Sequence, residues 1–257
     1  MAPTNRLSLC AVPDIPLIQA GDDLGAILVS AIERAHLSME DGDILVVAQK
    51  VVSKSERRYV ELTTIVPSSR ALRLGSQTGK DPRLVEVILS QSRRVVRYAP
   101  NVLIVEHRLG YVMANAGVDR SNVSSSACGE TVLLLPADPD RSAEGLRDRL
   151  AREFGKRVGV IINDSFGRPW RKGSVGVALG AAGLDSLRDL RGRPDLYDRK
   201  LEVSETAIAD EIASAASLVM GQADEGFPAV LVSGFSVSDV SIPARKLVRS
   251  SSEDLFR

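Results

Sequence analysis

In Arg157-Val-Gly-Val-Ile-Ile-Asn-Asp-Ser-Phe-Gly-Arg168, an apolar run typical of a buried strand stops abruptly on Asn163, Asp164 and Ser165. A strand fixes the side chain at its end, while the following loop leaves that side chain open to a ligand. Strand ends are therefore frequent sites of chemistry in proteins that combine helices and sheets. Asp164 is the first candidate for a functional residue.

Positive charge and small residues come directly after this predicted strand. Gly167, Arg168, Arg171 and Lys172 precede the run Gly173-Ser-Val-Gly-Val-Ala-Leu-Gly180. Oxygen-bearing side chains beside a cluster of positive charge are what a site for a metal ion and a phosphate group requires. The glycines of the run allow either close packing of the chain or the close approach of a ligand.

The rest of the chain mixes helices and strands without a regular alternation, which predicts an α+β fold rather than a doubly wound sheet. Capping residues followed by apolar residues at a helical period predict the helices. These begin at Leu24 after Asp22-Asp23, at Pro82 after Asp81, at Asp140 with an end at Gly155, and after Ser204 with an end at Met220-Gly221. The predicted strands cover 44–47, 102–105, 111–114 and 229–232, the middle two as a hairpin.

The composition excludes several classes of protein. The chain has 257 residues, enough for one domain or two closely packed lobes. Its 33 basic and 33 acidic residues leave no net charge and only 4% of residues are aromatic, so no nucleic-acid partner is expected. Cys10 and Cys128 alone cannot make a disulfide framework or a zinc site. Without an apolar signal region or membrane-spanning run, a cytoplasmic protein is expected.

Two familiar kinds of site are not supported by the residues. Gly75-Ser-Gln-Thr-Gly-Lys80 has three residues between its glycines and Asp after the lysine, so it is a turn before the next helix rather than a phosphate-binding P-loop. His36 and His107 are the only histidines, and we expect both to be structural or solvent-facing. General base chemistry would then fall to carboxylates or lysine.

A second aspartate lies in the loop Asn115-Ala-Gly-Val-Asp-Arg-Ser-Asn122. One interpretation is a plain turn, which these residue types favour. The other is a metal site, because Asn115, Asp119, Ser121 and Asn122 supply four oxygen-bearing side chains. Together with Asp164 they fit magnesium, which prefers one or two carboxylates with water and substrate phosphates.

Two further segments carry polar residues at the ends of predicted elements. Gln49-Lys-Val-Val-Ser-Lys54 follows a strand, and its Ser53 and Lys54 either hold phosphate oxygens or face solvent. The loop from Met220 to Phe227 follows a helix and is by composition a helix stop.

Taken in order, these segments resemble one family, the coenzyme F420-0:L-glutamate ligases, or F420 γ-glutamyl ligases. The resemblance covers nearly the whole chain. It rests on Asp41-Gly-Asp-Ile-Leu-Val-Val-Ala-Gln-Lys-Val-Val-Ser-Lys54, on Asn115 to Asn122, on Val160 to Arg168, on Arg193-Pro-Asp-Leu-Tyr197, and on Ala209-Asp-Glu-Ile-Ala213 through Met220-Gly221.

The resemblance implies a GTP-dependent ligase. In this family GTP activates the terminal carboxylate of F420-0 as an acyl phosphate. The amine of L-glutamate then attacks it, giving F420-1 with GDP and phosphate, and some members add further γ-linked glutamate. Magnesium or manganese at two sites, a potassium ion and a homodimer are also implied. So is a family-specific fold that is neither ATP-grasp nor P-loop, here without the nitroreductase-like extension of some members.

The resemblance also assigns roles to individual residues. The implied metal ligands are Asp119, Asp164, Ser165 and Gln222. The implied catalytic residues are Asp119 and Asp164, acting through the metal, and Lys54. The implied nucleotide-binding residues are Ile15, Pro16, Leu17, Ile18, Gln49, Lys54, Asn122, Met220, Gly221, Gln222, Ala223, Asp224, Glu225, Gly226 and Phe227. Arg168, Arg171 and Lys172 could bind either the carboxylates of glutamate or the phosphodiester of F420-0.

The chain departs from the family pattern at three positions. Gln49 replaces a small hydroxyl residue of some relatives, which bears on its implied contact with GTP. Arg57 and Asp198 stand where members usually have glycine, and a loop that differs from the family's is expected if Arg57 blocks the turn. These departures favour an alternative, a non-catalytic GTP-binding regulatory protein of the same fold. A third interpretation is a related ligase for another carboxylate acceptor.

Overall fold

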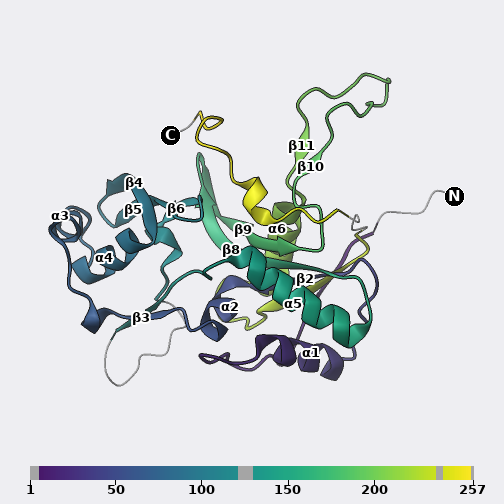
Figure 1. Cartoon of the computed structure of the whole chain (residues 1–257), viewed down its shortest axis with the longest axis horizontal. Helices are drawn as coiled ribbons and strands as arrows, with labels where there is room; N and C mark the ends of the chain where they lie inside the picture. The colour runs from purple at the N-terminus through teal and green to yellow at the C-terminus, as the bar shows by residue number, and fades with distance from the viewer. Residues whose placement is uncertain (1–5, 121–129, 236–239, 256–257) are drawn as a thin grey trace.

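The computed structural model describes residues 6–120, 130–235 and 240–255, with a five-stranded mixed sheet at the centre (Figure 1). The strands, in spatial order, are β1 (Ser8–Ala11), β12 (Ala229–Ser233), β2 (Ile44–Ala48), β8 (Gly159–Arg168) and β9 (Arg171–Ala182). Within this sheet β2 and β8 pair in parallel, and the other neighbours are antiparallel. The predicted α+β class is confirmed.

Helices cover both faces of this sheet. Helices α1 (Leu24–Arg34) and α5 (Pro139–Phe154) lie on one face, and α6 (Ile208–Met220) lies on the other. The alternation of β2 explains the arrangement: Leu45 and Val47 pack with α1 and α5, whereas Ile44 and Val46 pack with α6. Each such fully buried side chain contributes about 1.5–3 kcal/mol.

A second core lies beside the first, at the left of Figure 1. Its elements are α3 (Ser69–Thr78), α4 (Pro82–Ser90), β4 (Ser92–Ala99), β5 (Val102–His107) and β6 (Val112–Ala114). The chain reaches it from α2 (Gln49–Ser55) through β3 (Tyr59–Glu61), which pairs with β7 (Thr131–Leu133) on the way back. None of the helices in the described part of the chain is long and apolar enough to cross a membrane.

An arm formed by residues 188–206 projects from the body (Figure 1). Its base is the pair β10 (Arg188–Asp189) and β11 (Glu205–Thr206). This pairing explains why the predicted start of the last helix is wrong. Ser204 precedes a strand, and α6 begins only at Ile208 after Ala207. The other predicted caps are confirmed: the side chains of Asp23 and Asp81 accept backbone N–H groups at the starts of α1 and α4.

Strand β8 is longer than its apolar run predicts. It continues to Arg168 and turns back as β9, so the expectation that a strand ends at Asp164 is wrong. The parallel partner β2 does stop here, because its last residue Ala48 pairs with Asn163. Asp164 therefore lies just beyond the end of β2, where β8 is no longer covered by that strand. Its side chain is accessible to a ligand there although β8 itself continues.

Two glycines of β9, Gly176 and Gly180, serve close packing, whereas a Cβ atom at Gly173 would meet open space. A Cβ atom at Gly176 would clash with Ser217 and the backbone of α6, and one at Gly180 would clash with the backbone of Pro139 at the start of α5. Both helices therefore approach the strand closely.

The segment 75–80 is not a phosphate loop. It forms the last turn of α3, a helix that the sequence did not predict, and Gly79 ends the helix in the left-handed conformation at φ 69°.

His107 is buried, with 2% of its surface exposed, and its Nδ1 accepts the N–H of Leu109 at 3.0 Å. Burial, with a smaller contribution from the positive charges of Arg108, Arg58 and Arg93, lowers the pKa of His107 to about 4. His36 is exposed. Both locations agree with structural or solvent-facing histidines.

The burial of His107 predicts a loss of stability in acid. The unfolded chain binds a proton at this histidine near pH 6.5, whereas the folded chain does so only near pH 4, so stability falls as the pH drops through that window. The expected loss is on the order of 2 kcal/mol at pH 4.5. In His107→Asn an amide oxygen can still accept from Leu109, and the difference in Tm between pH 7 and pH 4.5 should shrink by several degrees. An equal difference in both proteins would contradict the prediction.

Candidate active site

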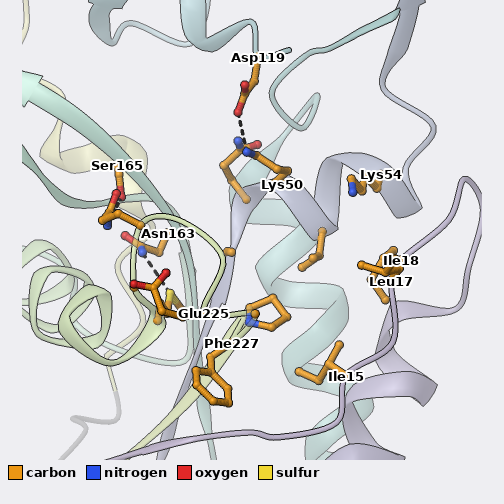
Figure 2. Close-up of a pocket in the computed structure, with 18 of the residues that line it drawn as sticks. Ile15, Leu17, Ile18, Lys50, Lys54, Asp119, Asn163, Ser165, Glu225 and Phe227 are labelled. Atoms are coloured by element: carbon orange, nitrogen blue, oxygen red, sulfur yellow. Dashed lines mark hydrogen bonds and ion pairs between the residues drawn. The ribbon is translucent and has the colours of Figure 1, made fainter. Parts of the chain in front are cut away.

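A cavity of about 830 Å³ opens at the side of the central sheet (Figure 2). Its walls are the N-terminal segment 15–19, the beginning of α2, the middle of β8, and the loop 221–228 that follows α6. Ile15, Leu17 and Phe227 supply apolar surface, with Lys54 near Leu17 and Glu225 near Phe227, while Lys50 and Asp119 lie on the other side of the cavity. A cavity of this size, part apolar and part polar, is typical of a small-molecule site.

The cavity brings together residues that are far apart in the sequence. Every residue for which the resemblance implies a role lies on its wall, apart from Asn122. Asn122 and its neighbour Ser121 fall outside the described residues. Arg168, Arg171 and Lys172 do not line the cavity, because they lie at the turn between β8 and β9. The individual roles stay predictions.

Asp164 is the most deeply held charge in the cavity. Its Oδ1 accepts the N–H of Ser165 at 2.8 Å, and the side chain of Gln49 is hydrogen-bonded to it. Burial raises the pKa of Asp164 to about 6, and the charge of Asp119 adds to the rise. A buried carboxylate beside a second negative charge attracts a compensating cation.

Asp119 is paired with Lys50, a residue for which the sequence suggested no role. The Lys50 Nζ lies 2.7 Å from the Asp119 Oδ2. The backbone of Asp119 exchanges two hydrogen bonds with Leu133, the last residue of β7, and this anchors Asp119 beside Lys50 of α2. The available signal was the spacing of Lys50 and Lys54, since residues four apart share one face of a helix.

Lys54 faces the cavity from the next turn of α2. It is half-buried, and burial lowers its pKa, with a further lowering by the nearby Lys50. In the described part of the chain its ammonium group has no ion-pair partner. A half-buried ammonium without a partner is unfavourable by itself, and an anionic ligand would offset that cost.

The neighbouring polar residues of α2 point inward. Ser53 is fully buried and donates to the Gln49 Oε1 at 3.0 Å, so the expectation that Ser53 could hold phosphate oxygens is wrong. Gln49, expected to contact the nucleotide, lines the cavity but uses its side chain on Ser53 and Asp164. The sequence did not predict α2, and the helix decides which residues face the ligand.

The loop after α6 is held by its own carboxylate. The Glu225 Oε2 accepts the N–H of Ala223 at 2.8 Å, and backbone N–H groups of the loop lower the pKa of Glu225. The carboxylate lies against Gly221, at φ 74°, where a Cβ atom would clash with it. Gln222 is then free to donate to the Ser165 Oγ at 2.9 Å, joining this loop to β8.

Asn163 is a cavity residue to which the sequence gave no role. Its Nδ2 donates to the Ser217 Oγ at 3.0 Å and to the Met220 Sδ at 3.4 Å. Its Oδ1 is buried and has no hydrogen-bond partner among the described residues. An unpaired buried acceptor costs about 1–3 kcal/mol, a cost that a ligand donor would remove.

The donors in the cavity fit a hard divalent cation. Asp119, Asp164, Ser165 and Gln222 all offer oxygen, the ligand that magnesium and manganese prefer. No group of three or more His, Cys, Asp or Glu side chains forms a metal cluster in the described ranges. Two carboxylates suit a magnesium-type ion that keeps water and substrate phosphates as its other ligands.

Arg57 and Asp198 adopt the backbone conformation that a glycine would take. Their φ angles are 58° and 59°. Arg57 therefore does not block a left-handed turn after α2, so the condition under which a different loop was expected is not met. The Arg57 guanidinium lies against Gly21, where a Cβ atom would meet its Nη2. This packing helps to hold a conformation that costs a non-glycine residue about 1–2 kcal/mol.

Replacing Arg57 by Gly is expected to raise Tm by about 1–2 °C, since relief of the left-handed strain exceeds the lost packing and the entropy of glycine. Arg57→Ala is the matched control, because it removes the guanidinium but keeps the Cβ atom, and it should lower Tm. Differential scanning calorimetry would measure both. Equal losses in the two variants would show that the side-chain packing outweighs the backbone strain.

Comparison with known proteins identifies the family of this chain. Residues 14–234 match the family described as F420-0:Gamma-glutamyl ligase. A relative from Methanopyrus kandleri, named coenzyme F420:L-glutamate ligase, is 47% identical over 259 residues, which cover 99% of this chain and 98% of the relative. Relatives of the same name from Methanothermobacter thermautotrophicus and Methanocaldococcus jannaschii are 44% and 43% identical over 98% and 95% of the chain, and over 99% and 94% of their own lengths. The chain therefore belongs to the F420-0:gamma-glutamyl ligase family.

Proposed function

We propose that this protein joins L-glutamate to the terminal carboxylate of F420-0 in a GTP-dependent reaction, giving F420-1, GDP and phosphate. Family membership and the names of the relatives support the two joined substrates. The observation that carries the proposal is the cavity itself, which sets Asp119 and Asp164 beside Lys50 and Lys54. Paired carboxylates next to ammonium groups suit phosphoryl transfer, which depends on positioning and charge stabilisation.

The proposed chemistry has two steps. A carboxylate oxygen of F420-0 attacks the γ-phosphorus of GTP, the bond to the bridging oxygen breaks, and GDP leaves. The glutamate nitrogen then attacks the acyl carbon of the resulting acyl phosphate, the carbon–oxygen bond to phosphate breaks, and the nitrogen loses a proton. Both steps need negative charge on phosphate oxygens to be stabilised. A further γ-linked glutamate would repeat the cycle.

The residues of the cavity would divide this work. Asp119 and Asp164, with Ser165 and Gln222, would hold magnesium or manganese. When bound, such an ion would offset charge on the phosphate oxygens. Lys54, which has no carboxylate partner within the described ranges, would contact the transferred phosphoryl group. The apolar surface supplied by Ile15, Leu17 and Phe227 would pack against a flat ring of the nucleotide or of F420-0.

Incubation of the purified protein with F420-0, GTP, L-glutamate and magnesium tests this function. Mass spectrometry should show F420-0 gaining one glutamyl residue, with GDP formed in equal amount. GTP binding without turnover would replace the ligase with the non-catalytic interpretation. Glutamylation of a different carboxylic acid, but not of F420-0, would indicate a related ligase.

We also propose that the protein is a homodimer built through the arm. Leu196, Tyr197 and Val203 are 99%, 83% and 84% exposed on a segment that extends away from the body (Figure 1). Apolar side chains gathered on a projecting arm favour burial against a second copy.

The double variant Leu196→Ser with Tyr197→Ser should shift the protein to monomers in analytical ultracentrifugation. Trp170→Ser, which changes an exposed aromatic residue outside the arm, should not. Dimers of unchanged affinity in the double variant would exclude the arm.

A further inference from the structure

A second hollow, of about 480 Å³, lies between α3 and β4. Its polar lining consists of Arg70, Arg73, Gln77, Arg97 and Tyr98, and no carboxylate belongs to it. It shares no residue with the cavity of the proposed ligase reaction, and it belongs to the second core of the protein. We call it the arginine hollow.

Both walls of the arginine hollow have a local cause in the sequence. Arg70, Arg73 and Gln77 are spaced by three and four residues, so they share one face of α3. On β4, the pairing with β5 shifts register between Val95 and Arg97. A regular strand would turn alternate side chains away, but four consecutive residues, 95–98, line the hollow at this irregularity. Bulges of this kind commonly redirect side chains at binding sites.

The three arginines of the hollow are left without compensating charge. In the described ranges none of their guanidinium groups makes an ion pair or a side-chain hydrogen bond. By contrast, Arg93 and Arg94 on the same strand both contact Glu106. Glu86, which packs against the start of α3, is occupied by the backbone N–H and hydroxyl of Ser68.

Three like charges around one hollow repel one another, and a bound anion would remove that repulsion. The chain as a whole has no net charge, so this local excess is not a consequence of a basic composition. Each guanidinium offers a planar fork of donors that matches phosphate oxygens, and Tyr98 and Gln77 can add single hydrogen bonds.

We propose that the arginine hollow is a second ligand site that binds a diphosphate group. Three guanidinium groups exceed what one carboxylate would require, and they suit the several charges and many acceptor oxygens of a diphosphate. The volume accommodates a free diphosphate or the diphosphate end of a nucleotide. The site is distinct from the proposed catalytic cavity and needs no metal ligand of the chain.

Calorimetric titration tests the site, with sodium pyrophosphate as the probe at low salt and with EDTA to prevent metal-dependent binding in the main cavity. The variant is Arg73→Gln with Arg97→Gln. The control is Arg141→Gln, which removes an exposed arginine from α5. Pyrophosphate should bind the double variant at least tenfold more weakly, and the control within twofold of the unchanged protein. Lys54→Met, in the main cavity, should not alter this binding.

Parallel titrations with GDP and with inorganic phosphate separate the two sources of the diphosphate group. Because GDP can also bind the main cavity, only GDP binding that is lost in the double variant and kept in Lys54→Met reports on the hollow. Such binding tighter than that of pyrophosphate would assign a nucleotide, and weaker binding would assign free diphosphate. Equal pyrophosphate affinity in the unchanged protein and the double variant, or a loss caused only by Lys54→Met, would overturn the site.

Thermal unfolding gives a second readout that does not depend on activity. Pyrophosphate should raise the Tm of the unchanged protein and of Arg141→Gln, but not of the double variant. Without ligand the double variant should be at least as stable as the unchanged protein at low salt, because two repelling charges are gone. If the double variant does not fold, Arg97→Gln alone serves the same comparison. A similar Tm increase in all proteins would contradict the proposal.

Discussion

Asp164→Asn is expected to lower the rate of F420-0 glutamylation on the order of 10³-fold while leaving the fold intact. Asparagine has nearly the same shape, and its side-chain oxygen can still accept the N–H of Ser165 that now binds the Asp164 Oδ1. What disappears is the negative charge of Asp164, one of the two that the pair Asp119 and Asp164 place near Lys50. Removing a buried charge with a raised pKa should also leave stability unchanged or slightly increased.

Asp210→Asn is the matched control for this variant. Asp210 is also largely buried, burial raises its pKa, and its Oδ1 accepts the N–H of Ala178 at 2.9 Å, but it lies outside the cavity. Turnover should stay within a few-fold in Asp210→Asn. Steady-state GTP hydrolysis coupled to glutamylation, with a manganese titration monitored by electron paramagnetic resonance, would measure both effects. An active Asp164→Asn enzyme with normal manganese binding would remove Asp164 from the metal site.

The parts of the fold that were predicted correctly have strong local signals. The apolar run before Asn163 predicted a strand, and Asp23 and Asp81 predicted helix starts, because these features depend on neighbours in sequence. Helix α2 has no such signal: Ala48 precedes it, and no side chain caps it. The arm was missed for a related reason, since β10 and β11 are short strands that are defined by their mutual pairing.

The candidate site likewise has residues that the sequence could identify and contacts that it could not. Asp119 and Asp164 could be selected from the sequence because each stands among polar residues next to an apolar run. The ion pair between Lys50 and Asp119 could not, because it depends on the tertiary contact that brings the Asp119 loop over α2. The pattern of residue types likewise left open whether Ser53 binds phosphate or faces solvent, and the helix instead turns it into the core.

Lys54→Met is expected to lower kcat/KM for GTP about 10²-fold or more, an effect similar to removing one preorganised donor from an oxyanion site. Methionine has a similar length and keeps the half-buried packing of the stem, so the change isolates the charge. In the described residues the Lys54 ammonium has no carboxylate to hold it, which leaves it available for the phosphate oxygens. Calorimetric binding of GTP with magnesium should weaken together with kcat.

Lys50→Met should give a different result, and the contrast tests the assignment of the two lysines. Lys50 lies 2.7 Å from Asp119, so its removal takes away a positive charge that now offsets Asp119 and Asp164 and should tighten manganese binding in the absence of nucleotide. Lys54→Met should leave nucleotide-free manganese binding nearly unchanged, because its ammonium does not contact either aspartate. If instead Lys54→Met retains full turnover, or if the two variants alter manganese binding equally, Lys54 would not be the phosphate contact. The two lysines, one helical turn apart, would then act only through their combined positive charge.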